Sequence, residues 1–142
     1  MDHIVWLDAE ANELDNLVAG NKSMIINGTD EKNKIAREIN EGDKMYLVSM
    51  QEGEHAEATA VVKCIFSSEE LTVEESFETI IRHQDKLQLP DSQFEDVAGK
   101  KFLVMVELSD VEAIKPVNIS RYAVGRANNW LSVRRVAEHR MS

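Results

Sequence analysis

An alternation of apolar and polar side chains from Ala56 to Phe66 most constrains the fold of this chain. Its apolar residues recur at every second position, which is the side-chain period of a β-strand and not the period of about 3.6 residues found in a helix. A strand of this kind buries one face, so the chain must build a sheet with a core on that side. The residues expected on the buried face are Ala58, Ala60, Val62, Cys64 and Phe66.

Further strands and short helices are expected before and after this segment. Residues 101–108 are apolar on both faces, which is typical of a strand at the centre of a sheet. Thr72 and Glu75 have the spacing of a capping box and predict the start of a helix. The buried stripe of that helix is expected to contain Phe77, Ile80, Ile81 and Leu87.

The remaining segments complete the expected fold. Strands are predicted at residues 3–7, 22–26, 44–50 and 111–114, helices at residues 9–18 and 29–39, a helical turn after Asp91 or Ser92, and a loop-like tail after Pro116. Five or six strands with interspersed short helices predict a small α+β barrel. A chain of 142 residues suits one domain, which we expect to span residues 1–142.

Charge is distributed unevenly along the chain. Residues 1–114 carry 10 Lys/Arg against 25 Asp/Glu, whereas the basic C-terminal segment 115–142 carries 6 against 1. A net charge of −10 repels a phosphate backbone over long range, so non-specific binding to duplex DNA is expected to be weak. A small or single-stranded ligand remains compatible with this balance.

Cysteine usage and the N-terminal residues predict a cytoplasmic protein. The single cysteine, Cys64, excludes an internal disulfide framework, and the N-terminus lacks the basic start and apolar run of a secretory signal. No apolar stretch approaches the roughly 20 residues that span a bilayer. The four histidines show no ligand spacing with one another or with Cys64, so we expect neither a metal nor a cofactor.

Two glycine-marked strand starts gather polar groups. Gly20 and Lys22 precede one apolar strand, and Gly42 and Asp43 precede another. A lysine at such a place can donate hydrogen bonds to a ligand or act as a base, although it can also be a solvated strand end. Asp43 can bind a ligand, although Asp after Gly is also ordinary turn chemistry.

The order of these two motifs resembles the signature of ASCH-like domains, which are small members of the PUA-like group of barrels. That group is associated with RNA and modified nucleobases, so the resemblance implies single-stranded RNA or a modified nucleoside as the partner. Such domains have a Gly-x-Lys strand start ending in an arginine, followed by a Gly-Asp turn into the next strand. Asn27 stands at the arginine position in this chain, which makes a phosphate or carboxylate ligand less favoured.

One branch of ASCH-like domains is similar to amidohydrolases that act on acylated cytidine nucleosides. These use a lysine, a threonine three residues later and a glutamate from further along. Lys22 matches the lysine, whereas Ile25 stands at the threonine position. The candidate glutamate is Glu75, and the alternatives near it are Glu69, Glu70 and Glu74.

The basic tail interleaves cations, amides and aromatic rings. Base stacking on an aromatic ring contributes about 1–3 kcal/mol, so Trp130 and its neighbours can form a surface that faces a nucleotide. The alternative is that Trp130 caps the core while the arginines balance an acidic body. The residues expected to contact a ligand are Gly20, Lys22, Ser23, Asn27, Gly42, Asp43, Tyr122, Arg126, Asn128 and Trp130.

Three functions therefore remain open. The first is a domain that binds a nucleobase, nucleoside or single-stranded RNA between Lys22, Asn27 and the Gly42–Asp43 turn, without catalysis or with weak catalysis. The second is an amidohydrolase for N4-acylated cytidine-type nucleosides that uses Lys22 and Glu75. The third is a protein-interaction module whose acidic body meets a basic partner.

Overall fold

The structure is a computed structural model that describes residues 1–32, 34–49, 55–125 and 129–136, with side chains omitted at 123–125. Its six strands form one sheet in the order β2-β5-β4-β3-β1-β6, in which only β1 and β3 run parallel. The strands are β1 (Asp2–Leu7), β2 (Met24–Thr29), β3 (Lys44–Ser49), β4 (His55–Ser67), β5 (Phe102–Asn118) and β6 (Trp130–Val133).

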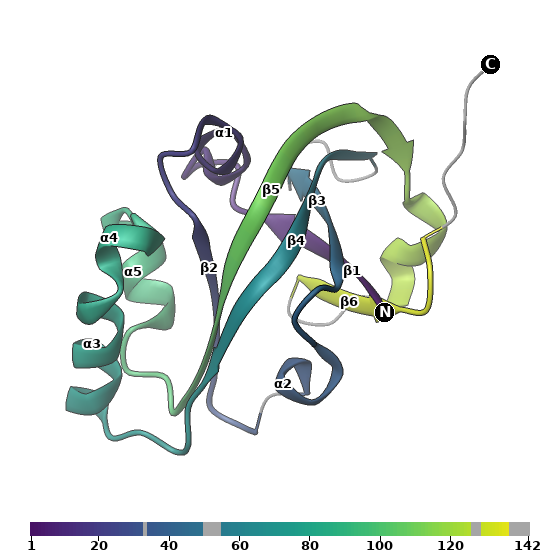
Figure 1. The fold of residues 1–142 in the computed structure, drawn as a ribbon. Coiled ribbons are helices and arrows are strands. Elements are labelled where there is room, and N and C mark those ends of the chain that lie inside the picture. Colours follow the sequence, from purple (N-terminus) through teal and green to yellow (C-terminus); the bar gives the residue numbers. More distant parts are fainter. Residues whose placement is uncertain (33, 50–54, 126–128, 137–142) are drawn as a thin grey trace.

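The sheet curls into a half-barrel because its two longest strands bend together (Figure 1). β4 and β5 pair along most of their lengths, and their register shifts at three places, between Ala56 and Ala58, between Thr59 and Val61, and between Val62 and Cys64. Such irregularities bend a strand and increase its twist. The expected small α+β barrel of five to six strands is therefore confirmed, in the form of a six-stranded half-barrel.

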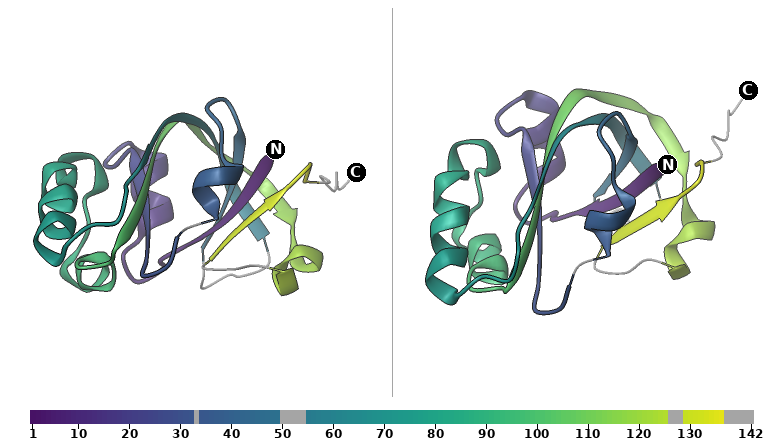
Figure 2. Two further views of the ribbon diagram at one scale, coloured as in Figure 1. Left: turned by 90° about the horizontal axis from the view of Figure 1, so that it is seen from below. Right: turned by 60° about the horizontal axis from the view of Figure 1, so that its bottom comes forward.

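Helices close the ends and one side of the half-barrel. In Figure 1, α1 lies at one open end and α2 at the other, while α3, α4 and α5 form a layer beside β2. Figure 2 shows this layer on one side of the molecule and the N-terminus on the other. The helices are α1 (Glu13–Ala19), α2 (Ile35–Glu38), α3 (Val73–Arg82), α4 (Gln84–Leu87), α5 (Asp91–Val97) and the 3-10 helix η1 (Ser120–Gly125).

The core has three parts that follow from the curl. The concave face of the sheet packs against α1 and α2. This part of the core includes Ile25 of β2 and Leu17 of α1. The outer face of β2 and β5 packs under the helical layer, where Met105 meets Ile80. A third cluster lies on the other face of β1 and β3, around Tyr46.

The capping box of α3 is confirmed, but its buried stripe is not the expected one. The Thr72 side chain accepts from the backbone N–H of Glu75, and the Glu75 side chain accepts from the backbone N–H of Thr72. Ile80 is fully buried, whereas Phe77 is 39% and Ile81 62% exposed. The predicted burial of Phe77 and Ile81 is therefore wrong, because the inner face of α3 carries small hydroxyl residues as well as Ile80.

The alternation of β4 is confirmed as far as Val62 and then shifts. Ala58, Ala60 and Val62 are buried, but Cys64 is exposed. The register shift between Val62 and Cys64 turns the strand, so that Ile65 packs against the concave core instead. The inward positions predicted for Cys64 and for Phe66, which is 40% exposed, are wrong for this reason.

The tail after Pro116 is more regular than expected. β5 continues through Pro116 to Asn118, and β6 adds an edge strand that pairs antiparallel with β1. Trp130 is 5% exposed and belongs to the concave core. The tail therefore completes the sheet, and its tryptophan packs inside it.

Replacing the two adjacent isoleucines of α3 separately tests the observed orientation of this helix. We expect Ile80→Ala to lower the free energy of unfolding by about 2–5 kcal/mol, because it opens a cavity under the helical layer. Ile81→Ala should cost less than about 1 kcal/mol, because this side chain is largely exposed. Urea unfolding of both variants measures the difference; equal losses would contradict the orientation.

Candidate functional site

The two glycine-marked strand starts lie at opposite ends of the half-barrel. β2 is antiparallel to β5, β5 to β4 and β4 to β3, so β2 and β3 run in opposite directions. The start of β2 lies near α1 and the start of β3 near α2 (Figure 1). The structure therefore does not bring Lys22 and Asp43 together, and each motif has its own polar surroundings.

The turn after α1 directs Lys22 into the protein. Gly20 ends the helix with φ 81°, a left-handed conformation that glycine adopts without strain. The backbone N–H groups of Asn21 and Lys22 then donate to the carbonyl of Asn16 at 2.9 and 3.3 Å. Lys22 is only 4% exposed as a result.

Glu13, the first residue of α1, neutralises this buried lysine. The Lys22 Nζ donates to Glu13 Oε2 at 2.6 Å, and the Glu13 side chain is 5% exposed. Gln93 Nε2, from α5, donates to the same oxygen at 3.0 Å. These three side chains, here called the Glu13 cluster, join α1, the start of β2 and α5.

Two oxygens of the Glu13 cluster keep unused hydrogen-bonding capacity. Gln93 Oε1 is buried and has no hydrogen-bond partner within the described residues. Within the described residues, Glu13 Oε1 accepts a long bond of 3.4 Å from the backbone N–H of Asp8. A ligand with N–H groups could therefore bond to the Glu13 carboxylate without displacing Lys22.

A cavity of about 240 Å³ is lined in part by Glu13. Its volume is just below the range of about 300–1,000 Å³ typical of small-molecule sites, so it suits a ligand of modest size. The lining carries several carboxylates, which disfavour an anion. The lining residues are Asp8, Ala9, Asn12, Glu13, Leu14, Asp15, Ser49 and Glu57.

At the other end of the half-barrel, His3 links three elements. The fully buried ring receives the Trp130 Nε1–H at its Nδ1 atom (3.3 Å) and contacts Ser132 Oγ at the same nitrogen (2.9 Å). His3 Nε2 lies 2.8 Å from Asp43 Oδ2. His3, Asp43, Trp130 and Ser132 are here called the His3 cluster.

The partners of His3 select its tautomer. An indole N–H can only donate, so Nδ1 must be the accepting nitrogen when the ring is neutral. The proton then lies on Nε2, which donates to the Asp43 carboxylate. The Trp130 ring also meets the imidazole edge-on, with centroids 5.9 Å apart. This arrangement fastens the edge strand β6 to β1 and to the turn before β3.

The Asp43 carboxyl is held in its ionised form. Burial alone would raise its pKa, but the hydrogen bonds from His3 and from the backbone N–H of Asn40, with the charges of His3 and the N-terminus, lower the pKa below its ordinary value. The Asn40 bond measures 2.9 Å, and the N-terminal nitrogen lies 3.8 Å from Asp43 Oδ1. Asp43 is thus part of the closed His3 cluster as well as of a turn.

The other predicted ligand residues are spread over the molecule. The Ser23 backbone bonds to Lys86 and Leu108, and Asn27 is half-buried on β2, on the same face as the core residue Ile25. Gly42 donates its N–H to the backbone of β4. Tyr122 receives a hydrogen bond from Arg121, whose guanidinium also lies over the ring. Arg126 and Asn128 lie outside the described residues.

Glu75 is not brought near Lys22. The chain enters α3 beside the last residue of β2, because Leu71 bonds to Lys101 and β5 begins opposite Thr29. Lys22 lies before Met24, the first residue of β2, and the strand from Met24 to Thr29 alone spans about 16 Å at about 3.3 Å per residue. The exposed Glu75 carboxylate accepts from the capping residue at 2.9 Å, and that bond is the main cause of its lowered pKa.

Sequence reasoning did not find Glu13, Gln93, His3 or Ser132. Glu13 had a usable signal, since it lies four residues before Leu17 and so on the buried face of the same helix. His3 also had a usable signal, since it lies two residues before the buried Val5 and therefore on the same face of β1. Gln93 and Ser132 offered none, because their partners come from distant parts of the chain.

Membrane and metal sites were sought in the described part of the chain. None of its helices has the length and apolar character needed to cross a bilayer. Nor does it contain a group of three or more His, Cys, Asp and Glu side chains able to hold a metal ion. The expected absence of a metal or cofactor remains a prediction.

The half-barrel with its helical side layer defines the class of the protein as a small α+β barrel domain. Solved structures of ASCH from Zymomonas mobilis share this fold: the ASCH protein itself superposes with a TM-score of 0.65 at 16% identity, covering 94% of this chain and 87% of that chain. Its serine-to-alanine and tyrosine-to-phenylalanine variants superpose with a TM-score of 0.64, at 14% and 16% identity, covering 94% of this chain and 88% and 90% of theirs.

The chain therefore has an ASCH-like fold, as the strand-start motifs predicted. No family model matches the sequence, and no curated protein matches it. The agreement with the Zymomonas mobilis structures concerns the fold alone.

Removing either partner of the buried ion pair should destabilise the protein strongly. We expect Lys22→Met to lower the free energy of unfolding by about 3–5 kcal/mol, because it leaves the Glu13 carboxylate buried without a counter-charge. Adding Glu13→Leu to this variant should recover part of the loss. Lys86→Met is the matched control, since Lys86 is 45% exposed in its pair with Glu107 and should cost about 0–1 kcal/mol. A Lys22→Met loss no larger than that of the control would contradict a buried pair.

Asp43 should contribute a pH-dependent stability. Because its folded-state pKa is lowered, the contribution is present above the ordinary Asp pKa of about 3.9 and is lost as the pH falls through the lowered value. The difference in unfolding free energy between the wild type and Asp43→Asn should therefore be constant near neutral pH and shrink below about pH 4. Urea unfolding from pH 7 to pH 3 measures it, with the exposed Asp96→Asn as control. A difference that grows on acidification would contradict the assignment.

Proposed function

We propose that the chain recognises a nucleobase or nucleoside in the cavity beside Glu13. The observation that carries this proposal is that Glu13, whose buried carboxylate is fixed by Lys22 and Gln93, is also one of the residues that line a cavity of about 240 Å³. A fixed carboxylate is a specific acceptor for the exocyclic amino group of cytosine. Adenine carries an amino group of the same kind.

The charge of the cavity favours the base over its phosphate. Asp8, Asp15 and Glu57 line the cavity with Glu13, and among these four carboxylates Glu13 alone has a buried lysine as its partner within the described residues. A phosphate would be repelled there, whereas a neutral base would not. Single-stranded RNA would have to offer an unstacked base and keep its backbone outside, which is a usual mode of RNA recognition.

The resemblance to ASCH-like domains supports the same class of ligand, since it implies RNA or a modified nucleobase as the partner. The present structure sharpens the expectation at one point. Lys22 faces Glu13 inside the protein, so its role is to hold a carboxylate and not to meet a phosphate directly. A cytoplasmic location would suit such a ligand.

Calorimetric titration with nucleosides tests this proposal. We expect cytidine and adenosine to bind more tightly than uridine, which has no exocyclic amine, and cytidine 5′-monophosphate to bind more weakly than cytidine. Glu13→Gln should weaken cytidine binding by about tenfold or more, because a charge-assisted acceptor is lost. Asp15→Asn combined with Glu57→Gln should reduce the difference in affinity between cytidine and its monophosphate, because two carboxylates that repel the phosphate are removed.

The control for this titration lies at the opposite end of the half-barrel. Asp43→Asn changes the His3 cluster and should leave cytidine affinity unaltered. If cytidine bound equally well to Glu13→Gln, or bound the wild type not at all, the cavity would not be a nucleoside site. Thermal unfolding of each variant checks that it is folded at the temperature of the titration.

A second candidate function, hydrolysis of N4-acylated cytidine, rests on the contact of 2.6 Å between Lys22 and Glu13. The pair brings a lysine and a glutamate together, although Glu13 precedes Lys22 in the chain, whereas the amidohydrolase resemblance implies a glutamate from further along such as Glu75. Glu13 would hold the attacking water and Lys22 would stabilise charge on the amide oxygen. Water would add across the amide bond to give acetate and cytidine. Ile25, buried in the core, supplies no hydroxyl for this reaction.

Incubation with N4-acetylcytidine, followed by chromatography of cytidine and acetate, tests the second candidate. We expect a rate that falls by at least about a hundredfold in Glu13→Gln, because general acid–base groups contribute about 10²–10⁴-fold. Glu75→Gln should leave the rate unchanged, since Glu75 caps α3 at the other end of β2. A rate equal in the wild type and in Lys22→Ala would remove this mechanism while leaving nucleoside binding untouched.

A further inference from the structure

Helix α3 presents an apolar stripe to solvent. Val73, Phe77 and Ile81 follow one another at intervals of four residues, and they are 60%, 39% and 62% exposed. Side chains with this spacing lie one above another on the same side of a helix. The stripe therefore runs along the whole of α3.

The packing of α3 on the protein uses mainly another face of the helix, and of the stripe it involves chiefly one side of Phe77. The inner face of the helix carries Ser76, Thr79 and Ile80. Ser76 Oγ accepts from the Gly99 N–H at 3.1 Å, which ties the helix to the turn before β5. The edge of the Phe77 ring rests on Phe94 with centroids 5.7 Å apart. Phe77 is thus positioned by its contact with Phe94, while the outward side of the stripe stays exposed to solvent.

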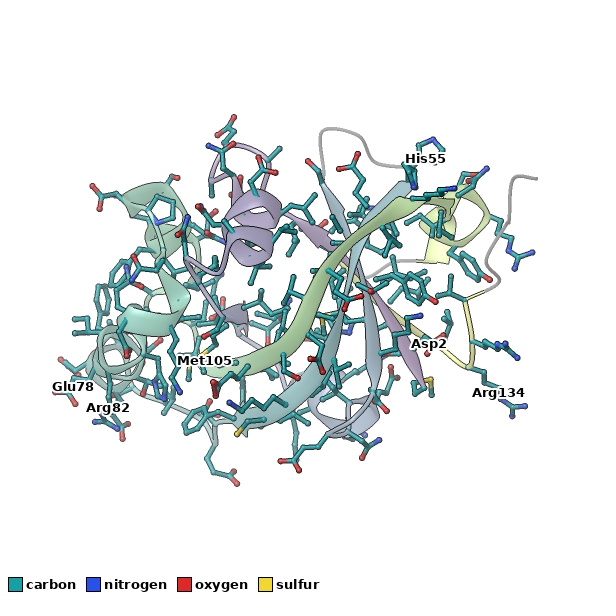
Figure 3. All side chains as sticks on the ribbon, turned by 45° about the horizontal axis from the view of Figure 1, so that its top comes forward. Asp2, His55, Glu78, Arg82, Met105 and Arg134 are labelled. Atoms are coloured by element: carbon teal, nitrogen blue, oxygen red, sulfur yellow. The ribbon has the colours of Figure 1, made fainter. Side chains whose placement is uncertain are left out.

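Acidic residues border the stripe. Glu74 and Glu78 directly follow Val73 and Phe77 and so lie about 100° further around the helix. Residues 68–99, which include the whole helical layer, carry nine Asp/Glu against two Lys/Arg. Figure 3 shows Glu78 and Arg82 on the outer side of this layer, with Arg134 of the basic tail at the opposite side of the molecule.

We propose that this stripe, with Glu74 and Glu78, is the docking site for a basic amphipathic helix of a partner protein. The apolar face of that helix would cover Val73, Phe77 and Ile81, and its Lys or Arg side chains would meet the two glutamates. A second copy of this chain fits less well, because pairing α3 with α3 would set acidic borders against each other. The site is separate from the nucleoside cavity, since none of the cavity-lining residues lies on α3.

Binding of a synthetic peptide tests the proposal. The probe is a peptide of about 18 residues with leucines on one helical face and lysines on the other, a length at which a helix is less marginal in water. Titration of the ¹⁵N-labelled protein should shift the amide signals of α3 and of the turn at Gly99. Phe77→Ser combined with Ile81→Ser should weaken the affinity by about tenfold or more, since two contact residues are lost.

Matched controls separate this site from general stickiness. Val18→Ser removes an apolar side chain that is 40% exposed on α1 and should leave the affinity unchanged. The same peptide with glutamate in place of lysine should not bind. Both stripe positions are exposed, so the double variant should keep its fold and its cytidine affinity.

Three results would overturn the proposal. One is equal affinity of the lysine peptide for the wild type and the double variant. The second is a set of shifts confined to residues away from α3. The third comes from analytical ultracentrifugation without peptide: a wild-type dimer that the double variant abolishes would make a second copy the occupant.

Discussion

The contact between Lys22 and Glu13 is the interaction on which the proposed site depends. A buried ammonium and a buried carboxylate each cost several kcal/mol to remove from water, so neither is tolerated there without the other. Their meeting requires α1 to end at Gly20 in a left-handed turn, which brings the chain back beneath the helix. Gln93 adds α5 to the same point. The pair therefore sets where α1 closes the half-barrel and which carboxylate faces the cavity.

The opposite end of the half-barrel is closed by a different set of polar contacts. His3, Asp43 and Trp130 satisfy one another inside the protein and fasten the last strand to the first. A cluster with its hydrogen bonds satisfied specifies the packing of an edge strand. The two ends thus differ: within the described residues, the buried side-chain polar atoms of the His3 cluster all have hydrogen-bond partners, whereas the Glu13 cluster keeps an unpartnered amide oxygen.

The sequence predicted the fold well because its strands and caps are local patterns. The alternation from Ala56 to Val62, the apolar strand at residues 101–108 and the Thr72 capping box all depend on neighbours along the chain. Strand direction depends instead on pairing between distant segments. The two strand starts were therefore expected to share one pocket, whereas the sheet order places them at opposite ends of the half-barrel. The orientation of α3 was not predicted for a related reason. The Ser76 hydroxyl on its inner face accepts a hydrogen bond from the N–H of Gly99, which lies far along the chain.

The candidate site was predictable only in part. Lys22 was identified from its place after Gly20, but the partner Glu13 was not, because a carboxylate in the first turn of a helix is explained equally well by the helix dipole. The sequence around Lys22 and Glu13 also does not indicate a partner such as Gln93, which lies far along the chain.

A crystal structure of the protein soaked with cytidine tests the central claim most directly. We expect the base in the cavity beside Glu13, with the exocyclic amine about 2.7–3.2 Å from a carboxylate oxygen. A base stacked beside the His3 cluster, or a cavity that stays empty at saturating cytidine, would contradict it.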